Sequence, residues 1–332
     1  MRTSLVALTV TVFLSGCDRS AGPNAPREAM RGEQNGLRRA SGVGCSPRFA
    51  GTTLGCPIAP DIIGLYAPDT STFYLAGANR PGEAERVFQD GPEGFEWMAV
   101  TGDWDGDGVD TVGLYDRASL RFYLLNSNET KSPDLAFRYG CGPVRWVPLA
   151  GDWDGDGRDT VGLYDPGRGE FFLVNSHVSN RPDIRLAIRA GRPSGMPVAG
   201  DWDGDGRDTP GLYSPEKSMF YLTNTDRGGS VDRSFRYGSA GTCQVPIAGD
   251  WDGDGHDTVG LYRPDSSTFF LKNSHSCGPA DLVIRFGKKG GTWVPIAGRW
   301  RGLAKGNPPE QDLPIALRPV RGSAGVPPQV HR

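Results

Sequence analysis

Short apolar runs separated by turn residues recur along most of the chain and predict β-strands. In one representative stretch the runs are residues 146–153 (WVPLAGDW), 160–164 (TVGLY), 170–175 (EFFLVN) and 184–191 (IRLAIRAG). Each run has the length of a strand, is rich in β-branched and aromatic residues, and is bounded by Gly, Pro, Asn or Asp. No window shows convincing helical periodicity. The pattern therefore predicts an all-β protein.

The group of four runs repeats with a step of 49 residues. A segment of the form GDWDGDGxDTxGLY begins at Gly102, Gly151, Gly200 and Gly249. The same step links Phe73, Phe122, Phe171, Phe220 and Phe269, and it links Asn126, Asn175, Asn224 and Asn273. Four strands in a repeat of this length are typical of one blade of a β-propeller. A linear β-solenoid is the alternative, although solenoid repeats are usually shorter.

The two ends of the repeat region predict how the propeller closes. The first unit lacks the Asp-rich opening, whereas residues 292–300 (TWVPIAGRW) supply one extra opening strand. Giving this C-terminal strand to the first blade produces a five-bladed β-propeller of four-stranded, 49-residue repeats. Closure of this kind removes the unpaired sheet edge of an open array. We expect the propeller to occupy residues 44–301 and residues 302–332 to form a disordered tail.

Aspartate is the unusual feature of the composition, because 29 Asp stand against 10 Glu. Each of four loops carries Asp at positions 1, 3, 5 and 8 and Gly at position 6: Asp103, Asp105, Asp107 and Asp110; Asp152, Asp154, Asp156 and Asp159; Asp201, Asp203, Asp205 and Asp208; Asp250, Asp252, Asp254 and Asp257. Carboxylates this close repel one another without a cation, and their spacing suits Ca²⁺ better than Mg²⁺. Asx turns without metal are the alternative interpretation. The sequence predicts about four structural calcium ions.

The loop segment, preceded by FRYG and a Pro-Ile-Ala strand, resembles the FG-GAP/VCBS-type repeats of integrin-α-like β-propellers over about residues 57–300. The resemblance implies that the loop joins the first two strands of a blade and holds calcium through positions 1, 3 and 5, with the backbone carbonyl at position 7 as a further ligand. That family usually has Asp at position 9, whereas this chain has Asp at 8 and Thr at 9. The last ligand is therefore open between the two. The first unit and residues 299–301 (RWR) lack the site.

The N-terminus predicts export. Residues 1–16 combine Arg2 with an apolar stretch from Leu5 to Leu14, which fits a signal peptide and is too short to span a bilayer. The end of this segment, Leu14-Ser15-Gly16-Cys17, resembles a bacterial lipobox, which implies cleavage before Cys17 and its lipidation. An ordinary signal peptide cut a few residues later is the alternative. We expect residues 17–43 to form a flexible tether to the membrane of the cell envelope.

Five cysteines follow Cys17, and export permits disulfides among them. Cys45 and Cys56 are the most plausible pair because they are close in sequence. The remaining three, Cys141, Cys243 and Cys277, leave one over, and the sequence alone does not pair them.

The functional expectation is a binding or adhesion module for a protein ligand. A net charge of −3 and the lack of a basic run give no argument for nucleic acid. No catalytic motif is recognisable, so we do not expect an enzyme. We also expect the protein to be monomeric. The periodic Trp and Tyr residues could stack on sugars, as in a lectin, although packing between blades is favoured. The alternatives are therefore a carbohydrate-binding lectin and a polysaccharide-acting enzyme.

Overall fold

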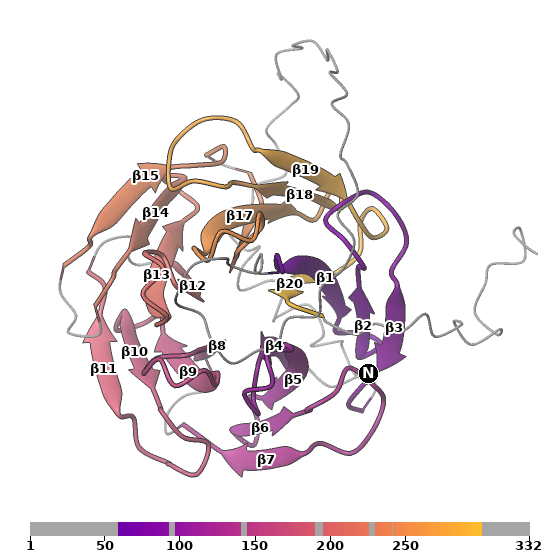
Figure 1. The fold of residues 1–332 in the computed structure, drawn as a ribbon, viewed down its shortest axis with the longest axis vertical. Coiled ribbons are helices and arrows are strands. Elements are labelled where there is room, and N and C mark those ends of the chain that lie inside the picture. Colours follow the sequence, from indigo (N-terminus) through magenta and orange to yellow (C-terminus); the bar gives the residue numbers. More distant parts are fainter. Residues whose placement is uncertain are drawn as a thin grey trace, which may run out of the picture.

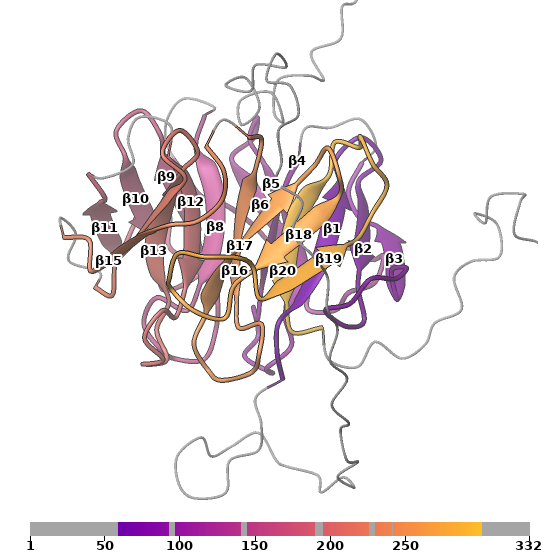
Figure 2. The ribbon, with the colours of Figure 1, turned by 90° about the horizontal axis from the view of Figure 1, so that it is seen from above.

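A computed structural model describes residues 59–92, 97–140, 145–189, 195–225, 230–240 and 242–300. In this part of the chain, five four-stranded antiparallel sheets surround a central axis (Figure 1). Turned by 90°, the molecule shows the five sheets within one common layer (Figure 2). The prediction of a five-bladed β-propeller is confirmed. The described residues form no helix at all, and hence none that could cross a membrane.

Four blades are each built from four consecutive strands, and the order of these strands in the sheet goes from the central axis to the rim. Blade 2 consists of β4 (Trp97–Gly102), β5 (Thr111–Asp116), β6 (Arg121–Leu124) and β7 (Leu135–Arg138); blade 3 of β8 (Val147–Gly151), β9 (Thr160–Asp165), β10 (Glu170–Leu173) and β11 (Ile184–Ala187); blade 4 of β12 (Met196–Gly200), β13 (Thr209–Ser214), β14 (Met219–Leu222) and β15 (Arg233–Arg236); blade 5 of β16 (Val245–Gly249), β17 (Thr258–Arg263), β18 (Thr268–Leu271) and β19 (Leu282–Arg285). The blades follow one another around the ring in chain order (Figure 1).

Blade 1 contains both ends of the described chain. Its sheet has the order β20-β1-β2-β3, in which β1 is Ile62–Ala67, β2 is Thr72–Leu75, β3 is Arg86–Gln89 and β20 is Val294–Gly298. The C-terminal strand pairs antiparallel with β1, with Ile62 opposite Gly298. The predicted closure of the first blade by the C-terminal strand is therefore confirmed, and the inner edge of β1 is paired with β20.

The hydrophobic core lies between neighbouring blades. For example, one cluster joins Tyr66 and Phe73 of blade 1 to Val112 and Leu114 of blade 2, and all four are fully buried. The glycine of each GLY motif makes room for this packing: a Cβ at Gly113 would lie 2.5 Å from a methyl carbon of Leu124.

The periodic aromatic residues belong to this core. Each Trp at loop position 2 and its counterpart Trp300 is at most 4% exposed, and each Tyr of the GLY motifs at most 1%. Burial of one such side chain stabilises the fold by about 1.5–3 kcal/mol. Packing between blades, rather than sugar stacking, is what these residues do.

Two cysteines lie among the described residues, and the structure distinguishes them. Cys243 is disulfide-bonded, whereas Cys277 is a free, exposed thiol. Of the two described cysteines, only Cys243 therefore takes part in a disulfide. Cys17, Cys45, Cys56 and Cys141 lie outside the described residues, as do the predicted signal peptide, the tether and the tail.

Candidate metal centres and the carboxylate latches

The Asp-rich loops join the first and second strands of blades 2 to 5. In each loop the carboxylates at positions 1, 3 and 5 offer oxygens that all lie within 4.8 Å of one another; these groups are Asp103, Asp105 and Asp107; Asp152, Asp154 and Asp156; Asp201, Asp203 and Asp205; Asp250, Asp252 and Asp254. Each triad could hold a metal ion. Oxygen-only donors of this kind favour a hard cation.

Backbone hydrogen bonds fix the shape of each loop. In blade 2 the carboxylate of Asp103 accepts hydrogen bonds from the backbone N–H groups of Gly106 (2.8 Å), Asp107 (3.0 Å) and Gly108 (2.7 Å). Gly106 and Gly108 adopt positive φ values of 76° and 82°, which explains glycine at positions 4 and 6. An ionised carboxylate has about four acceptor sites, so Asp103 retains capacity for a cation.

The protein only partly offsets the cost of burying the negative charge of the position-1 carboxylates. Burial raises the pKa of Asp103, Asp152 and Asp201 above the usual aspartate value, although backbone N–H donors oppose the shift. A cation beside these carboxylates would favour their charged form.

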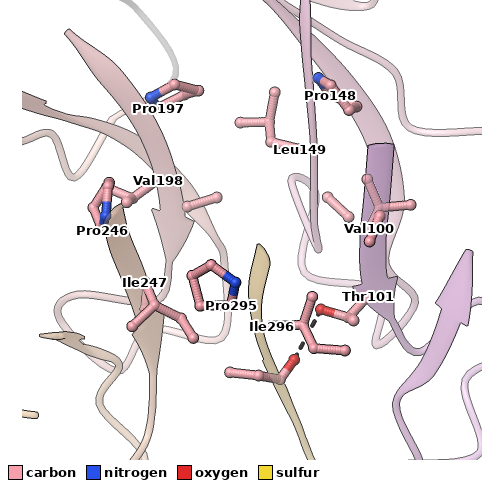
Figure 3. Close-up of a pocket in the computed structure, with 15 residues that line it drawn as sticks. Val100, Thr101, Pro148, Leu149, Pro197, Val198, Pro246, Ile247, Pro295 and Ile296 are labelled. Atoms are coloured by element: carbon pink, nitrogen blue, oxygen red, sulfur yellow. Dashed lines mark hydrogen bonds between the residues drawn. The ribbon is translucent and has the colours of Figure 1, made fainter. Parts of the chain in front are cut away.

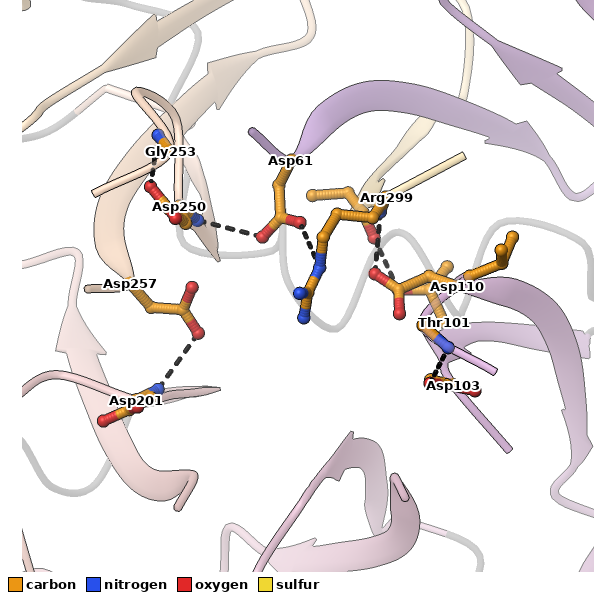
Figure 4. Close-up of polar contacts among 12 residues, drawn as sticks. Asp61, Thr101, Asp103, Asp110, Asp201, Asp250, Gly253, Asp257 and Arg299 are labelled. Atoms are coloured by element: carbon orange, nitrogen blue, oxygen red, sulfur yellow. Dashed lines mark hydrogen bonds and ion pairs between the residues drawn. The ribbon is translucent and has the colours of Figure 1, made fainter. Parts of the chain in front are cut away.

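Position 8 lies apart from the triads and serves a different contact. Asp159 of blade 3 donates its backbone N–H to the carbonyl of Asp103 in blade 2 (2.9 Å), and its carboxylate accepts the backbone N–H of Asp103 (2.8 Å). We call this reciprocal pair of bonds a carboxylate latch. The same latch joins Asp208 to Asp152, Asp257 to Asp201, Asp61 to Asp250 and Asp110 to Arg299. Figure 4 shows three of these pairs.

Blade 1 retains the latch although it lacks the Asp-rich loop. Asp61 stands 49 residues before Asp110, and Arg299 stands 49 residues after Asp250. The carboxylate of Asp61 accepts the backbone N–H of Asp250 (2.9 Å), and that of Asp110 accepts the backbone N–H of Arg299 (2.7 Å). Position 8 is thus occupied by Asp in all five blades, with or without a triad. The 49-residue step could have identified Asp61, but sequence reasoning missed it because the surrounding motif is absent.

The latches form a ring of five carboxylates with one arginine among them. The Nε of Arg299 lies 3.4 Å from Oδ1 of Asp61 (Figure 4). Burial, reinforced by neighbouring carboxylates, raises the pKa of Asp61 and Asp208 well above the usual value. Burial also raises the pKa of Asp159 to about 8 and that of Asp257 to about 7. The ring therefore carries less negative charge at neutral pH than five ordinary aspartates.

An asparagine accompanies every triad. Asn126, Asn175, Asn224 and Asn273 follow the third strand of blades 2 to 5, and each has a buried side-chain Oδ1 without a hydrogen-bond partner. The Nδ2 of Asn224 donates to Oδ2 of Asp203, the position-3 carboxylate of the same blade, at 2.7 Å. The corresponding residue in blade 1 is Gly77. The sequence shows the 49-residue step of these asparagines but not that Asn224 contacts a triad carboxylate.

The central channel is narrow, and most of the side chains that line it are apolar. A cavity of about 180 Å³ is lined by the inner strands of all five blades, with Pro148, Pro197, Pro246 and Pro295 among its residues (Figure 3). Small-molecule sites usually measure about 300–1,000 Å³. The hydroxyl of Thr101 is turned to the protein, donating to the carbonyl of Ala297 (2.8 Å).

Two histidines pack against aromatic rings between blades. His177 lies 5.9 Å from Trp104, and His275 lies 5.8 Å from Trp202, measured between ring centroids. Burial lowers the pKa of both histidines to about 4. Both imidazoles are therefore uncharged at neutral pH.

Fold and loops together define the protein as a five-bladed β-propeller with four carboxylate triads. No family model matches the chain, so the FG-GAP/VCBS resemblance stays a prediction, and no curated protein matches it. Among solved structures, the chain is similar to BBS1N in a complex with ARL6DN, at 11% identity over 76% of this chain and 81% of that chain, with a TM-score of 0.36. A Bacteroides fragilis protein that is assumed to be exported is 10% identical over 67% of this chain and 57% of that chain, with a TM-score of 0.33. Similarities this weak carry no argument about function.

Proposed function

We propose that this protein is an exported, lipid-anchored β-propeller that binds a protein ligand and is stabilised by about four calcium ions. The observation that carries the proposal is the convergence of three carboxylates in each of four loops. Oxygen ligands on a tight glycine-containing turn match the preference of Ca²⁺ for six to eight flexible oxygen donors. The buried, unpartnered Oδ1 of Asn224, whose amide contacts the triad residue Asp203, fits a cation at the same place.

Calcium would act on the structure rather than on a reaction. Exported modules bind this ion at about 10⁻⁴ to 10⁻³ M. At ten times the dissociation constant, each site adds roughly 1.4 kcal/mol to the free energy of unfolding. We expect calcium to raise the melting temperature of metal-stripped protein and excess EDTA to lower it again, as measured by calorimetry. A melting temperature that is the same with and without calcium would contradict the proposal of calcium sites.

The binding role rests on the arrangement of loops from several blades around one axis, which is an analogy with other propellers. Capture of envelope proteins by the calcium-loaded chain, followed by binding of each purified candidate, tests for a protein ligand. A positive glycan array would instead make the protein a lectin, and turnover of a polysaccharide would make it an enzyme. The lipid anchor is tested by growing cells with labelled palmitate: the protein should incorporate the label, and the Cys17→Ser variant should not.

A further inference from the structure

We propose that Asn126, Asn175, Asn224 and Asn273 each supply a side-chain amide oxygen to the cation held by the adjacent triad. Each metal site would then be assembled from two segments of a blade, the loop after its first strand and the end of its third strand. This inference rests on the proposed calcium sites.

The distribution of asparagine within the chain is the first argument. All four blades that contain a triad have Asn at this position, and blade 1, which has no triad, has Gly77. The propeller itself does not require the amide, because blade 1 forms the same four-stranded sheet without it. Asparagine therefore occurs at this position where the blade has a triad and is not needed to form the blade.

The state of the amide oxygen is the second argument. All four Oδ1 atoms are buried and lack a hydrogen-bond partner. A buried acceptor without a partner destabilises the fold, and four equivalent cases point to one shared missing partner. A cation satisfies an oxygen that no protein donor reaches.

The surrounding structure holds each asparagine in place. Its backbone N–H donates to an aspartate eight residues later, at 2.6 Å for Asn126, 2.9 Å for Asn175, 2.7 Å for Asn224 and 2.8 Å for Asn273. The backbone that carries each side chain is therefore fixed before any ion binds, which lowers the entropic cost of using the amide as a ligand.

Asn224 shows how near the amide comes to the triad. Its Nδ2 lies 2.7 Å from Oδ2 of Asp203, one of the three converging carboxylates. The amide group of Asn224, with its unpartnered Oδ1, therefore lies within reach of an ion that the triad holds. The Nδ2 hydrogen bond to the carboxylate and a bond from Oδ1 to the ion are compatible, because they use opposite ends of the amide.

The alternative role is to donate a hydrogen bond to the position-3 carboxylate and orient it, as groups behind metal ligands often do. Two substitutions separate these roles. In Asn→Asp a ligand oxygen is kept and the donor is lost, whereas in Asn→Leu both are lost and the branching at Cγ is kept.

The experiment measures calcium affinity by calorimetric titration of the full chain, with all four asparagines changed to Asp or to Leu. We expect the Leu variant to lose about tenfold or more in affinity and the Asp variant to equal or exceed the original. Terbium luminescence sensitised by the loop tryptophans (Trp104, Trp153, Trp202 and Trp251) gives a second measure of site occupancy. If Asp weakens binding as much as Leu, or if neither changes it, the inference is overturned.

Controls separate this outcome from misfolding and from failure of the sites. A single cooperative unfolding transition in EDTA shows that each of the three proteins is folded, and the single variants Asn224→Asp and Asn224→Leu serve if a fourfold variant does not fold. Asn128→Asp is the matched control, because the side chain of Asn128 already bonds to Val112 and Asp110. It should lower the melting temperature and leave the affinity unchanged. If the original chain binds no calcium, the proposed function itself fails, whatever the variants do.

Discussion

At the scale of single residues, the aspartates of one loop have different structural roles. Position 1 closes the loop on itself and contributes to the triad, whereas position 8 crosses to the preceding blade. Close approach at the latch also explains a glycine: a Cβ at Gly102 would lie 2.8 Å from Cβ of Asp159. The latch depends on an acceptor oxygen, not on negative charge, since its partner is a backbone N–H.

Substitution of Asp159 tests this distinction. We expect Asp159→Ala to lower the free energy of unfolding by about 1–3 kcal/mol, because the N–H of Asp103 is left without a partner. Asp159→Asn keeps an acceptor oxygen and should cost clearly less. Urea unfolding of both variants provides the measurement, and equal losses would contradict the role assigned to the latch.

The raised pKa values of the latch carboxylates predict a pH dependence. The folded-state pKa is about 8 for Asp159 and about 7 for Asp257, against about 4 for an aspartate in an unfolded chain. Folding therefore favours their protonated form, and this contribution is lost as the pH rises through 7 and 8. We expect the melting temperature in EDTA to fall from pH 5 to pH 8.5. The double variant Asp159→Asn with Asp257→Asn should show a weaker fall, and an unchanged slope would argue against these pKa values.

At the scale of elements, the pairing of β20 with β1 decides whether the ring is closed. This strand brings Arg299 to its latch with Asp110 and places Trp300, 4% exposed, in the core between blades 1 and 2. Without it, β1 presents an unpaired edge.

Truncation tests the role of this strand. A chain that ends after residue 291 should lose cooperative unfolding and aggregate, because β20, the Arg299 latch and Trp300 are all removed. A chain that ends after residue 301 should unfold like the full chain. Thermal unfolding and size-exclusion chromatography compare the two, and cooperative unfolding of the shorter chain would show that closure is dispensable.

At the scale of the whole molecule, calcium would make the net charge more positive. The chain carries a formal charge of −3 at pH 7, and removal of residues 1–16 with their one charged residue, Arg2, leaves −4. The raised pKa values of Asp159 and Asp257 make the metal-free protein less negative than this formal value. Because each bound ion carries +2, we expect saturating calcium to shift the mobility of the cleaved protein towards the cathode relative to EDTA, as measured by capillary electrophoresis. A mobility that does not respond to calcium would contradict four occupied sites.

The sequence by itself determined the number of blades, the four strands in each, the closure by the last strand and the grouping of Asp103, Asp105 and Asp107. These features depend on residues close in the chain or on a repeat that is visible without coordinates. Only the tertiary structure decided that Asp159 latches onto Asp103, that Asp61 completes the ring, and that Asn224 lies beside Asp203. The latch partners are 56 residues apart, or 189 at the closing seam. Contacts between blades depend on how the sheets are placed around the axis, and no local pattern of side chains specifies which aspartate joins a triad and which faces the preceding blade.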